Sequence, residues 1–462
     1  MNIRKTAAVM AAVLLLSLTA CADNSSNPMI ITPVEESAIH TYVTIQGEDY
    51  YVDTTFSLNL YGCDVTGEDV AEIGKLKNLR ELYLGGNSID DVTPLSGLTN
   101  LTKLDLGKNQ ISDVTPLSGL TNLTELYLWT NPISDISPLA KLTGLTWLNL
   151  NDNEVSDISP LAELTGLTVL NLNNNKISDI SPLAELTGLT GLDLNNNEIS
   201  DISPLAKLTE LTWLNLNDNE VSDILPLSEL KNLTTLDLGD NKIRNISPLS
   251  RLTNLTKLDL EVNEIGDISP LAKLTNLTRL HLGDNQIGDI TPLVGLTDLT
   301  YLVLYNNQIG DVSSLSGLIN LTTLDLWSNH ISDISPIAEL TGLTGLDLNN
   351  NEISDISPLA GLTKLTELDL SLNDKISDLI PLSGLKNLTN LNLEHSDRIS
   401  DLTPLEGLIN LTDLNLSSTE IDDIKPLAKL KNLTWLELRG CGIGETDSEW
   451  LKARLPDCSV LL

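Results

Sequence analysis

Residues 145–166 read LTWLNLNDNEVSDISPLAELTG, and nearly the same 22 residues recur along most of the chain. The consensus is LxxLxLxxNxISDISPLAxLTx, with one asparagine as its anchor. A repeat of this length predicts a solenoid, in which each unit is one coil stacked on the next. The anchor holds strict register at Asn87, Asn109, Asn131, Asn153, Asn175, Asn197, Asn219, Asn241, Asn263, Asn285, Asn307, Asn329, Asn351 and Asn373. Cys63 precedes this series and Ser396, Thr419 and Cys441 follow it in the same position, which makes eighteen coils.

The LxLxx segment of each coil predicts a short strand. Because side chains on a strand alternate, the leucines point inward and the residues between them point outward. Stacking the coils joins these strands into a parallel sheet. The chain then turns at the asparagine, whose amide can satisfy backbone groups of neighbouring coils. Ser, Thr and Cys offer a smaller polar atom at the same place.

The second half of each coil, DISPLAxL, predicts a short helical turn of the 3₁₀ type. We expect Ser159 to cap such a turn and Pro160 to occupy its first helical position. Fifteen of the sixteen equivalent positions from Pro94 to Pro426 hold proline, and Ser314 is the exception. The predicted fold class is therefore α/β, a right-handed solenoid with its parallel sheet on the concave face and 3₁₀ turns on the convex face.

Both ends of the array need caps, because a single coil buries too little apolar surface to fold alone. Residues 38–76 are expected to form the N-terminal cap and first coil, with a hairpin within 42–54 and a helix over 67–75. Residues 77–443 form the repeat array. Residues 444–462 are expected to form the C-terminal cap, with a helix over 448–454 and the segment 458–462 laid over the last coil.

The first twenty residues have the pattern of a secretory signal. Arg4 and Lys5 precede an apolar run from Ala7 to Leu18, which is too short to cross a bilayer. The LTAC ending at Cys21 resembles the bacterial lipobox, whose cysteine carries lipid and becomes the mature N-terminus. We therefore expect export and lipid anchoring to the bacterial cell membrane, facing outward, with residues 21–37 as a polar tether. A plain cleaved signal peptide is the alternative.

The net charge of −37 argues against nucleic acid as a partner. The four cysteines are too few and too scattered for a disulfide-stapled small fold or a zinc site. A bond between Cys441 and Cys458 remains open, because Cys441 also has a structural role in the anchor position.

Three positions of each coil, six, four and two residues before the anchor, are expected to face outward from the sheet. Most hold small polar or acidic residues, yet ten of the fourteen Trp and Tyr residues also fall there. They are Tyr61, Tyr83, Tyr127, Trp129, Trp147, Trp213, Tyr301, Tyr305, Trp327 and Trp435. Because leucine builds the core, we expect exposed rings that belong to an interface and whose replacement leaves stability nearly unchanged. Rings that only stabilise the sheet by cross-strand pairing are the alternative.

These rings form two predicted clusters, each within a patch about 15–20 Å across given the usual spacing of strands. The first contains Tyr83, Tyr127, Trp129 and Trp147, with Lys103 and Asp105 between them. The second contains Tyr301, Tyr305 and Trp327, next to Arg279 and His281. Trp213 and Trp435 are isolated and are weaker candidates for partner binding.

The sequence contains no catalytic or metal-binding motif. His281, His330 and His395 lie near the sheet on different coils, without a matching cysteine or a paired histidine. Carboxylates of the sheet recur once per coil, which indicates repeat copying rather than a catalytic pair. The aspartates of the turns, from Asp91 to Asp355, are expected to cap backbone amides, and a calcium ladder is the alternative. We expect no enzyme activity, no cofactor and no metal ion.

The 22-residue period with the motif NxISDISPL resembles the internalin-type leucine-rich repeats of bacterial surface proteins, over about residues 77–443. The resemblance implies binding of a host or envelope protein through the concave face. No immunoglobulin-like segment follows the repeats, and LPDCS at 455–459 is not an LPxTG sorting signal, so host-cell invasion is not implied. Eukaryotic phosphatase-regulating proteins share the repeat length, but the signal segment argues against that intracellular role.

The sequence as a whole predicts an envelope-anchored adhesin or scaffold that binds a protein partner through its aromatic clusters. A glycan-binding surface lipoprotein is the alternative, because rings flanked by Asn, Asp and His also hold sugars.

Overall fold

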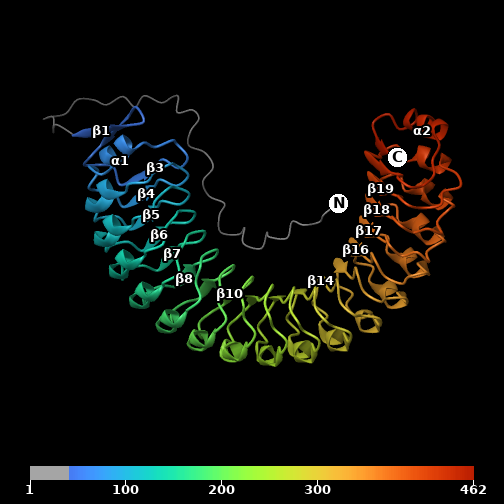
Figure 1. The fold of residues 1–462 in the computed structure, drawn as a ribbon, viewed down its shortest axis with the longest axis horizontal. Coiled ribbons are helices and arrows are strands. Elements are labelled where there is room, and N and C mark those ends of the chain that lie inside the picture. The colour runs from blue at the N-terminus through green and yellow to red at the C-terminus, as the bar shows by residue number, and fades with distance from the viewer. Residues whose placement is uncertain (1–40) are drawn as a thin grey trace, which may run out of the picture. The chain divides into compact units, whose positions relative to one another are not determined.

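The computed structural model describes residues 41–462, which form two compact units that divide after Val155. The expected signal segment, the expected lipidation site at Cys21 and the expected tether all lie outside the described residues. Each unit is a stack of coils, in which a three-residue strand alternates with a short 3₁₀ helix (Figure 1). Within residues 41–462, no helix is long and apolar enough to cross a membrane.

The first unit begins with an antiparallel hairpin of β1 (Tyr42–Ile45) and β2 (Glu48–Tyr51), followed by a parallel sheet. Its parallel strands are β3 (Ser57–Asn59), β4 (Glu81–Tyr83), β5 (Lys103–Asp105), β6 (Glu125–Tyr127) and β7 (Trp147–Asn149). Helix α1 spans Gly67–Ile73. The 3₁₀ helices are η1 (Thr93–Gly97), η2 (Thr115–Gly119) and η3 (Ser137–Lys141).

The second unit carries the remaining parallel strands. They are β8 (Val169–Asn171), β9 (Gly191–Asp193), β10 (Trp213–Asn215), β11 (Thr235–Asp237), β12 (Lys257–Asp259), β13 (Arg279–His281), β14 (Tyr301–Val303), β15 (Thr323–Asp325), β16 (Gly345–Asp347), β17 (Glu367–Asp369), β18 (Asn390–Asn392), β19 (Asp413–Asn415), β20 (Trp435–Glu437) and β21 (Ser459–Leu461). Each strand pairs in register with the next, one coil further along the chain.

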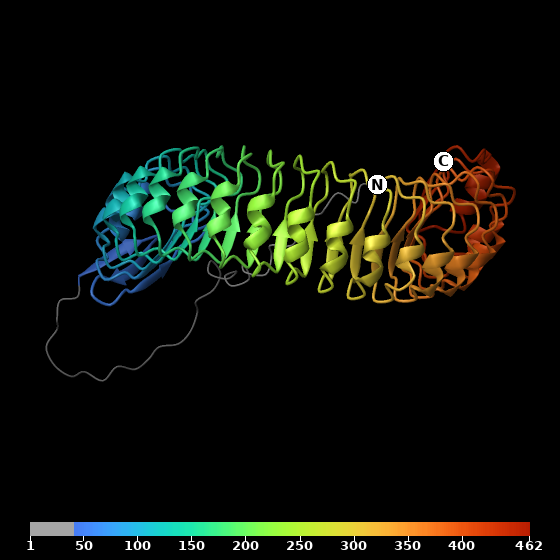
Figure 2. The same cartoon turned by 90° about the horizontal axis from the view of Figure 1, so that it is seen from below.

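The helices of the second unit alternate with these strands. The 3₁₀ helices are η4 (Ser159–Glu163), η5 (Ser181–Glu185), η6 (Ser203–Lys207), η7 (Leu225–Glu229), η8 (Ser247–Arg251), η9 (Ser269–Lys273), η10 (Thr291–Gly295), η11 (Ser313–Leu315), η12 (Ser335–Glu339), η13 (Ser357–Gly361), η14 (Ile380–Gly384), η15 (Thr403–Gly407) and η16 (Lys425–Lys429). The α-helix α2 (Glu445–Lys452) follows them. Within this unit the strands line the inner side of its curve (Figure 1), and the helices stand in a row along the outer side (Figure 2).

The anchor asparagines form the predicted ladder inside the turns. Asn285 is representative, because its Oδ1 accepts the Ile265 N–H at 3.0 Å and its Nδ2 donates to the carbonyls of Leu260 and Leu282 at 2.9 and 3.2 Å. One side chain thus supplies backbone partners to two neighbouring coils. The prediction from the repeat pattern is confirmed here.

The residues that replace asparagine at the anchor position form fewer hydrogen bonds to the backbone than an asparagine does. The Thr419 hydroxyl donates to the Leu416 carbonyl at 2.6 Å, and Cys441 Sγ contacts the same carbonyl at 2.9 Å. The Ser396 hydroxyl is buried and has no hydrogen-bond partner. The expectation that serine would also bond in this position is therefore wrong for Ser396, although the hydroxyl of Thr419 forms such a bond.

The 3₁₀ turns begin differently from the prediction. Ser159 is the first residue of η4 and does not cap it, while Pro160 is in the second position. The cap comes from the turn aspartate, because Asp157 Oδ1 accepts the Ser159 N–H at 2.8 Å. Equivalent bonds recur from Asp91 in the first unit to Asp423 in the second. These bonds confirm the predicted capping role of the aspartates.

Both ends of the described repeat array carry the expected elements. Helix α1 has a capping box formed by Thr66 and Asp69. At the other end, β21 adds to the sheet beside β20. Cys441 and Cys458, whose pairing was left open, are both free thiols in the structure.

Candidate binding face

We call the outward side of each unit's parallel sheet its sheet face. Strand β7 shows the pattern that creates it, since Leu148 is fully buried whereas Trp147 and Asn149 on either side are half-buried. The outward positions therefore lie where the sequence predicted. The rings themselves differ from the prediction, because among the ten only Tyr61 is exposed, at 44%, and the other nine are half-buried.

Several of the half-buried rings are covered on one side because they lie over a glycine of the preceding coil. A Cβ added to Gly107 would lie 2.0 Å from Trp129 Nε1, and one added to Gly283 would lie 2.6 Å from the Tyr305 ring. Tyr61 makes the reverse contact, because its ring lies 2.7 Å from a Cβ added to Gly85 of the following coil. Gly107 and Gly283 each stand 22 residues before their ring in the sequence, a regularity from which these contacts could have been predicted.

The first aromatic cluster (Tyr83, Tyr127, Trp129 and Trp147) is organised around one cation of the first unit. Lys103 Nζ lies 5.7 Å from the Tyr83 ring centre and 5.5 Å from that of Tyr127, within cation–π range. The ammonium also pairs with Glu125 at 2.8 Å, and the Tyr127 hydroxyl donates to the same carboxylate at 3.0 Å. Burial and this bond raise the pKa of Tyr127 well above its usual range, so the phenol stays neutral.

Trp147 extends the first aromatic cluster onto the next strand. Its ring is tilted by 36° against Tyr127, with 6.3 Å between the ring centres. Its Nε1 is buried and has no hydrogen-bond partner. Asp105 also lies among these residues, and burial raises the pKa of its carboxyl.

The second aromatic cluster (Tyr301, Tyr305 and Trp327) consists of stacked rings in the second unit. Tyr305 and Trp327 stack with 4.9 Å between centres and only 10° between planes. Tyr301 lies between two neighbours, because the Arg279 guanidinium is 4.3 Å from its centre and the His281 ring stacks on it at 5.0 Å. Such pairs on adjacent strands also stabilise the sheet. These contacts favour the alternative that the rings stabilise the sheet, while the small effect of their replacement on stability stays a prediction.

His281 has partners that the sequence analysis did not consider. Its Nδ1 lies 3.4 Å from Asp259 Oδ2 and 3.8 Å from Glu261 Oε2, both contributed by the preceding coil. Neither cysteine nor a second histidine lies near it in the sequence, and its carboxylate partners come from one repeat away. His330 and His395 are more than half exposed, each beside a single glutamate.

The two isolated tryptophans lie on strands outside both clusters. The Trp213 ring on β10 packs against Gly191 of β9, because a Cβ there would be 3.2 Å from the ring. Trp435 is half-buried on β20, in register with Asp413 and Ser459. The structure brings neither ring into a cluster, so both remain weak candidates.

The aspartate column of the sheet face is electrostatically unusual. Burial raises the pKa of Asp193 to about 6 and that of Asp325 to about 7. For Asp237, Asp259 and Asp347 it also raises the pKa, and neighbouring carboxylates add to the effect for Asp237 and Asp347. The column was expected to be a uniform product of copying, but its members differ because their neighbours differ.

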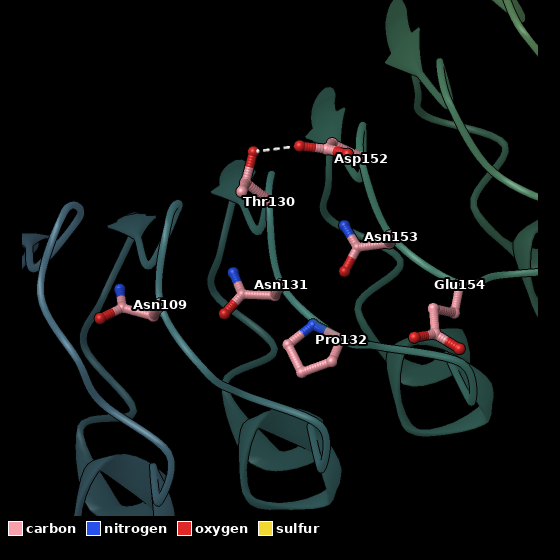
Figure 3. A pocket seen from close by; sticks show the side chains of 7 residues that line it. All are labelled: Asn109, Thr130, Asn131, Pro132, Asp152, Asn153 and Glu154. Carbon is pink, nitrogen blue, oxygen red and sulfur yellow. Dashed lines mark hydrogen bonds between the residues drawn. The ribbon is translucent and has the colours of Figure 1, made fainter.

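A shallow hollow of about 320 Å³ lies at the turn edge of the first unit (Figure 3). Asn109, Thr130, Asn131, Pro132, Asp152, Asn153 and Glu154 line it. Thr130 Oγ1 donates to Asp152 Oδ2 at 2.8 Å across one side. Its open shape and the engagement of its asparagines in the ladder make it a poor candidate for a ligand site.

Comparison with protein-family models identifies leucine-rich repeats along most of the array. The model described as "Leucine Rich repeats (2 copies)" matches residues 99–141, 143–185, 209–251, 231–273, 253–295, 275–318, 297–339, 319–361 and 341–381. A second model, "Leucine rich repeat", matches residues 165–221. A search of curated proteins found no match.

Among solved structures, the chain is similar to internalin InlF of Listeria monocytogenes, with 40% identity and a TM-score of 0.59. The match covers 70% of this chain and 90% of that one. A leucine-rich-repeat protein of Leptospira interrogans matches at 26% identity over 89% and 96% of the two chains, with a TM-score of 0.61. The functional domain of InlJ from Listeria monocytogenes, whose structure includes a cysteine ladder, matches at 26% identity over 70% and 69%, with a TM-score of 0.61.

Proposed function

Because the chain belongs to the internalin-type leucine-rich-repeat proteins, we propose that it is an envelope-anchored adhesin or scaffold whose sheet face binds a protein partner. Binding proceeds through the two aromatic clusters, with Lys103 and Arg279 as the charged contacts. Leucine-rich-repeat solenoids serve mainly as interaction scaffolds, and extended curved sheets suit that role.

The gathering of rings on the sheet face is the observation that carries this proposal. Tyr and Trp residues provide large contact areas at low entropic cost, and binding hot spots are rich in them. Here the rings are also held in place before any partner arrives, by glycines beneath Trp129 and Tyr305 and by stacking on Trp327. Such preorganisation reduces the entropy lost on binding.

The surroundings of the clusters favour a protein partner over a sugar. Each cluster combines a cation with its rings, although the chain as a whole carries a net charge of −37. A protein with apolar anchors and an acidic rim around them would complement this pattern. A sugar would need only one or two rings and would not depend on the cations.

Anchoring to the membrane is the second part of the proposal. The Arg4 and Lys5 pair, the apolar run and the LTAC ending support lipidation of Cys21. The polar segment 21–37 then separates the solenoid from the membrane surface. The sheet face would stay accessible to partners outside the cell.

The proposed function can be tested with variants that restore the residue types of other coils. Trp327→Asn and Tyr301→Thr place on the second cluster the residues that Asn349 and Thr323 hold in the same positions. A partner is first identified by cross-linking on intact cells or extracts, and its affinity is then measured with purified proteins. A glycan array run in parallel tests the alternative ligand class.

We expect the double variant to lower affinity for a protein partner at least about a hundredfold, since each lost anchor costs about 2 kcal/mol. Trp450→Asn is the matched control, because Trp450 lies on α2 rather than on the sheet face. The proposal is contradicted if partner affinity is unchanged both in this double variant and in a variant that replaces rings of the first cluster in the same way. Glycan binding that is unaffected by Arg279→Met would favour the alternative, a glycan-binding function.

A further inference from the structure

Asp259, Glu261 and His281 form a compact group on the sheet face of the second unit. Asp259 ends β12, Glu261 lies two residues beyond it, and His281 ends β13. One donor atom from each lies within 4.8 Å of the other two. Within residues 41–462, no other such group of three potential ligands occurs.

The spacing of the donor atoms fits a shared cation better than a direct ion pair. A charge-assisted hydrogen bond between imidazolium and carboxylate has an N···O distance of about 2.7–2.9 Å. His281 Nδ1 is 3.4 Å from Asp259 Oδ2 and 3.8 Å from Glu261 Oε2. Ligand atoms that surround a tetrahedral ion with bonds of about 2.0–2.1 Å are about 3.3 Å apart.

Groups outside the three residues hold the donors in position. The second oxygen of Glu261 accepts a hydrogen bond from the Tyr305 hydroxyl, and the His281 ring stacks on Tyr301. Asp259 Oδ1 accepts the backbone N–H of Glu261 at 3.0 Å, which leaves Oδ2 facing the histidine. Metal sites use second contacts of this kind to orient their ligands.

Comparison of the coils provides independent support. Most coils hold Asp, Asn or Tyr at the position of His281, and no other coil has a histidine there. Only one other coil, with Glu394, has an acid at the position of Glu261. Two departures from the repeated pattern thus occur on adjacent coils and place their side chains together.

The local charge also favours a cation. Two carboxylates, Asp259 and Glu261, lie beside His281, and Asp237 on β11 adds a third carboxyl in register with Asp259. The guanidinium of Arg279, on the same strand as His281, lies over the Tyr301 ring. A divalent ion would compensate the negative charge that this arrangement leaves.

We propose that Asp259, Glu261 and His281 bind one divalent transition-metal ion, for which Zn²⁺ fits best. One imidazole and two carboxylates match the nitrogen and oxygen donors that zinc accepts, and three protein ligands leave a fourth position for water. That position faces outward, because the group lies on the sheet face. The site does not depend on the proposed partner binding.

The test measures Zn²⁺ binding to the purified chain by isothermal titration calorimetry, after its thiols have been blocked. Variants His281→Gln and Glu261→Gln each remove one ligand and should fold, since other coils carry polar residues at these positions. His330→Gln is the matched control, because His330 is exposed and lies 4.0 Å from a single glutamate, Glu352. Absorption of bound Co²⁺ in the visible range reports the ligand set directly.

We expect one ion per chain, an affinity at least about a hundredfold lower in His281→Gln, and no change in His330→Gln. Tyr305→Phe should weaken binding about tenfold, because it frees the Glu261 carboxylate. Equal Zn²⁺ affinity in wild type and His281→Gln, or an identical Co²⁺ spectrum in both, would overturn the proposal. Measured partner affinity plays no part in this result, so the two proposals fail separately.

Discussion

Replacing Asn219 with leucine should destabilise the second unit strongly, because Asn219 is a central member of the ladder. Its side chain is 8% exposed. Its Oδ1 accepts the Ile199 N–H at 3.0 Å, and its Nδ2 donates to the carbonyls of Leu194, Leu216 and Asn217 at 2.9, 3.2 and 3.1 Å. Leucine is similar in size but provides none of these bonds.

The size of this loss of stability depends on which backbone groups are left without any hydrogen-bond partner. The Leu194 carbonyl still accepts from Asn197, and the Leu216 carbonyl still accepts from Asn241. The Ile199 N–H has no second acceptor among its hydrogen bonds, so it becomes a buried, unsatisfied donor. That costs about 1–3 kcal/mol, and the three lost donor bonds add about 1–2 kcal/mol together. We expect a loss of about 2–5 kcal/mol.

Urea denaturation followed by circular dichroism measures this loss, and hydrogen exchange at Ile199 localises it. Asn232→Leu is the matched control, because Asn232 is exposed and makes one bond, to the Thr209 carbonyl at 3.0 Å. It should change stability by no more than about 0.5 kcal/mol. If Asn219→Leu unfolds at the same urea concentration as this control, the ladder is not a source of stability and the reasoning fails.

Three further predictions concern other parts of the chain. Cys21→Ser should release the protein from membranes in cell fractionation, and quantitative retention would contradict lipid anchoring. Asp193→Asn should stabilise the protein at pH 7 by on the order of 1–2 kcal/mol in urea unfolding, because burial raises the folded-state pKa of Asp193 to about 6. An unfolded aspartate titrates near pH 4, so the folded state binds more protons between about pH 4 and 6, and this carboxyl's contribution to stability falls across that window. A difference between variant and wild type that does not grow over this range would refute the assignment. Gly283→Ala should lower the free energy of unfolding by about 1–3 kcal/mol, because the added Cβ would lie 2.6 Å from the Tyr305 ring. Gly295→Ala is the control and should not destabilise the protein, because no atom lies within 4 Å of the added Cβ. Equal unfolding midpoints for the two variants would contradict this account.

The fold was predictable from the sequence because the same information is repeated in every coil. Leucines at fixed spacing place the strands, and the asparagine fixes where each turn lies, so the leucine-rich-repeat solenoid is confirmed. Capping was predicted for Ser159 as well as for the turn aspartates, because both residue types accept backbone N–H groups and only geometry shows that Asp157 caps the 3₁₀ turn. Ser396 shows a similar limit, since sequence does not give the distance to a carbonyl.

The outward positions of the rings were predictable, but their contacts were not. Period two assigns Trp129 and Tyr305 to the sheet face, yet it does not show that each ring turns back over the preceding coil. The group around His281 was missed for a related reason. Its carboxylate partners lie 20 and 22 residues earlier in the sequence, beyond the reach of a local motif.

The glycine beneath an aromatic ring affects how a protein of this kind can change during evolution. Stretches 185–206 and 339–360 are identical, which indicates that whole repeats have been duplicated within the gene. If the repeat that carries Tyr305 were copied to follow a repeat without a glycine at the position of Gly283, the ring would lose its support. The heritable module for a supported aromatic ring is then a pair of neighbouring repeats. Unequal recombination that joins repeats out of this pairing would preserve the solenoid and lose the arrangement of rings proposed to bind a partner.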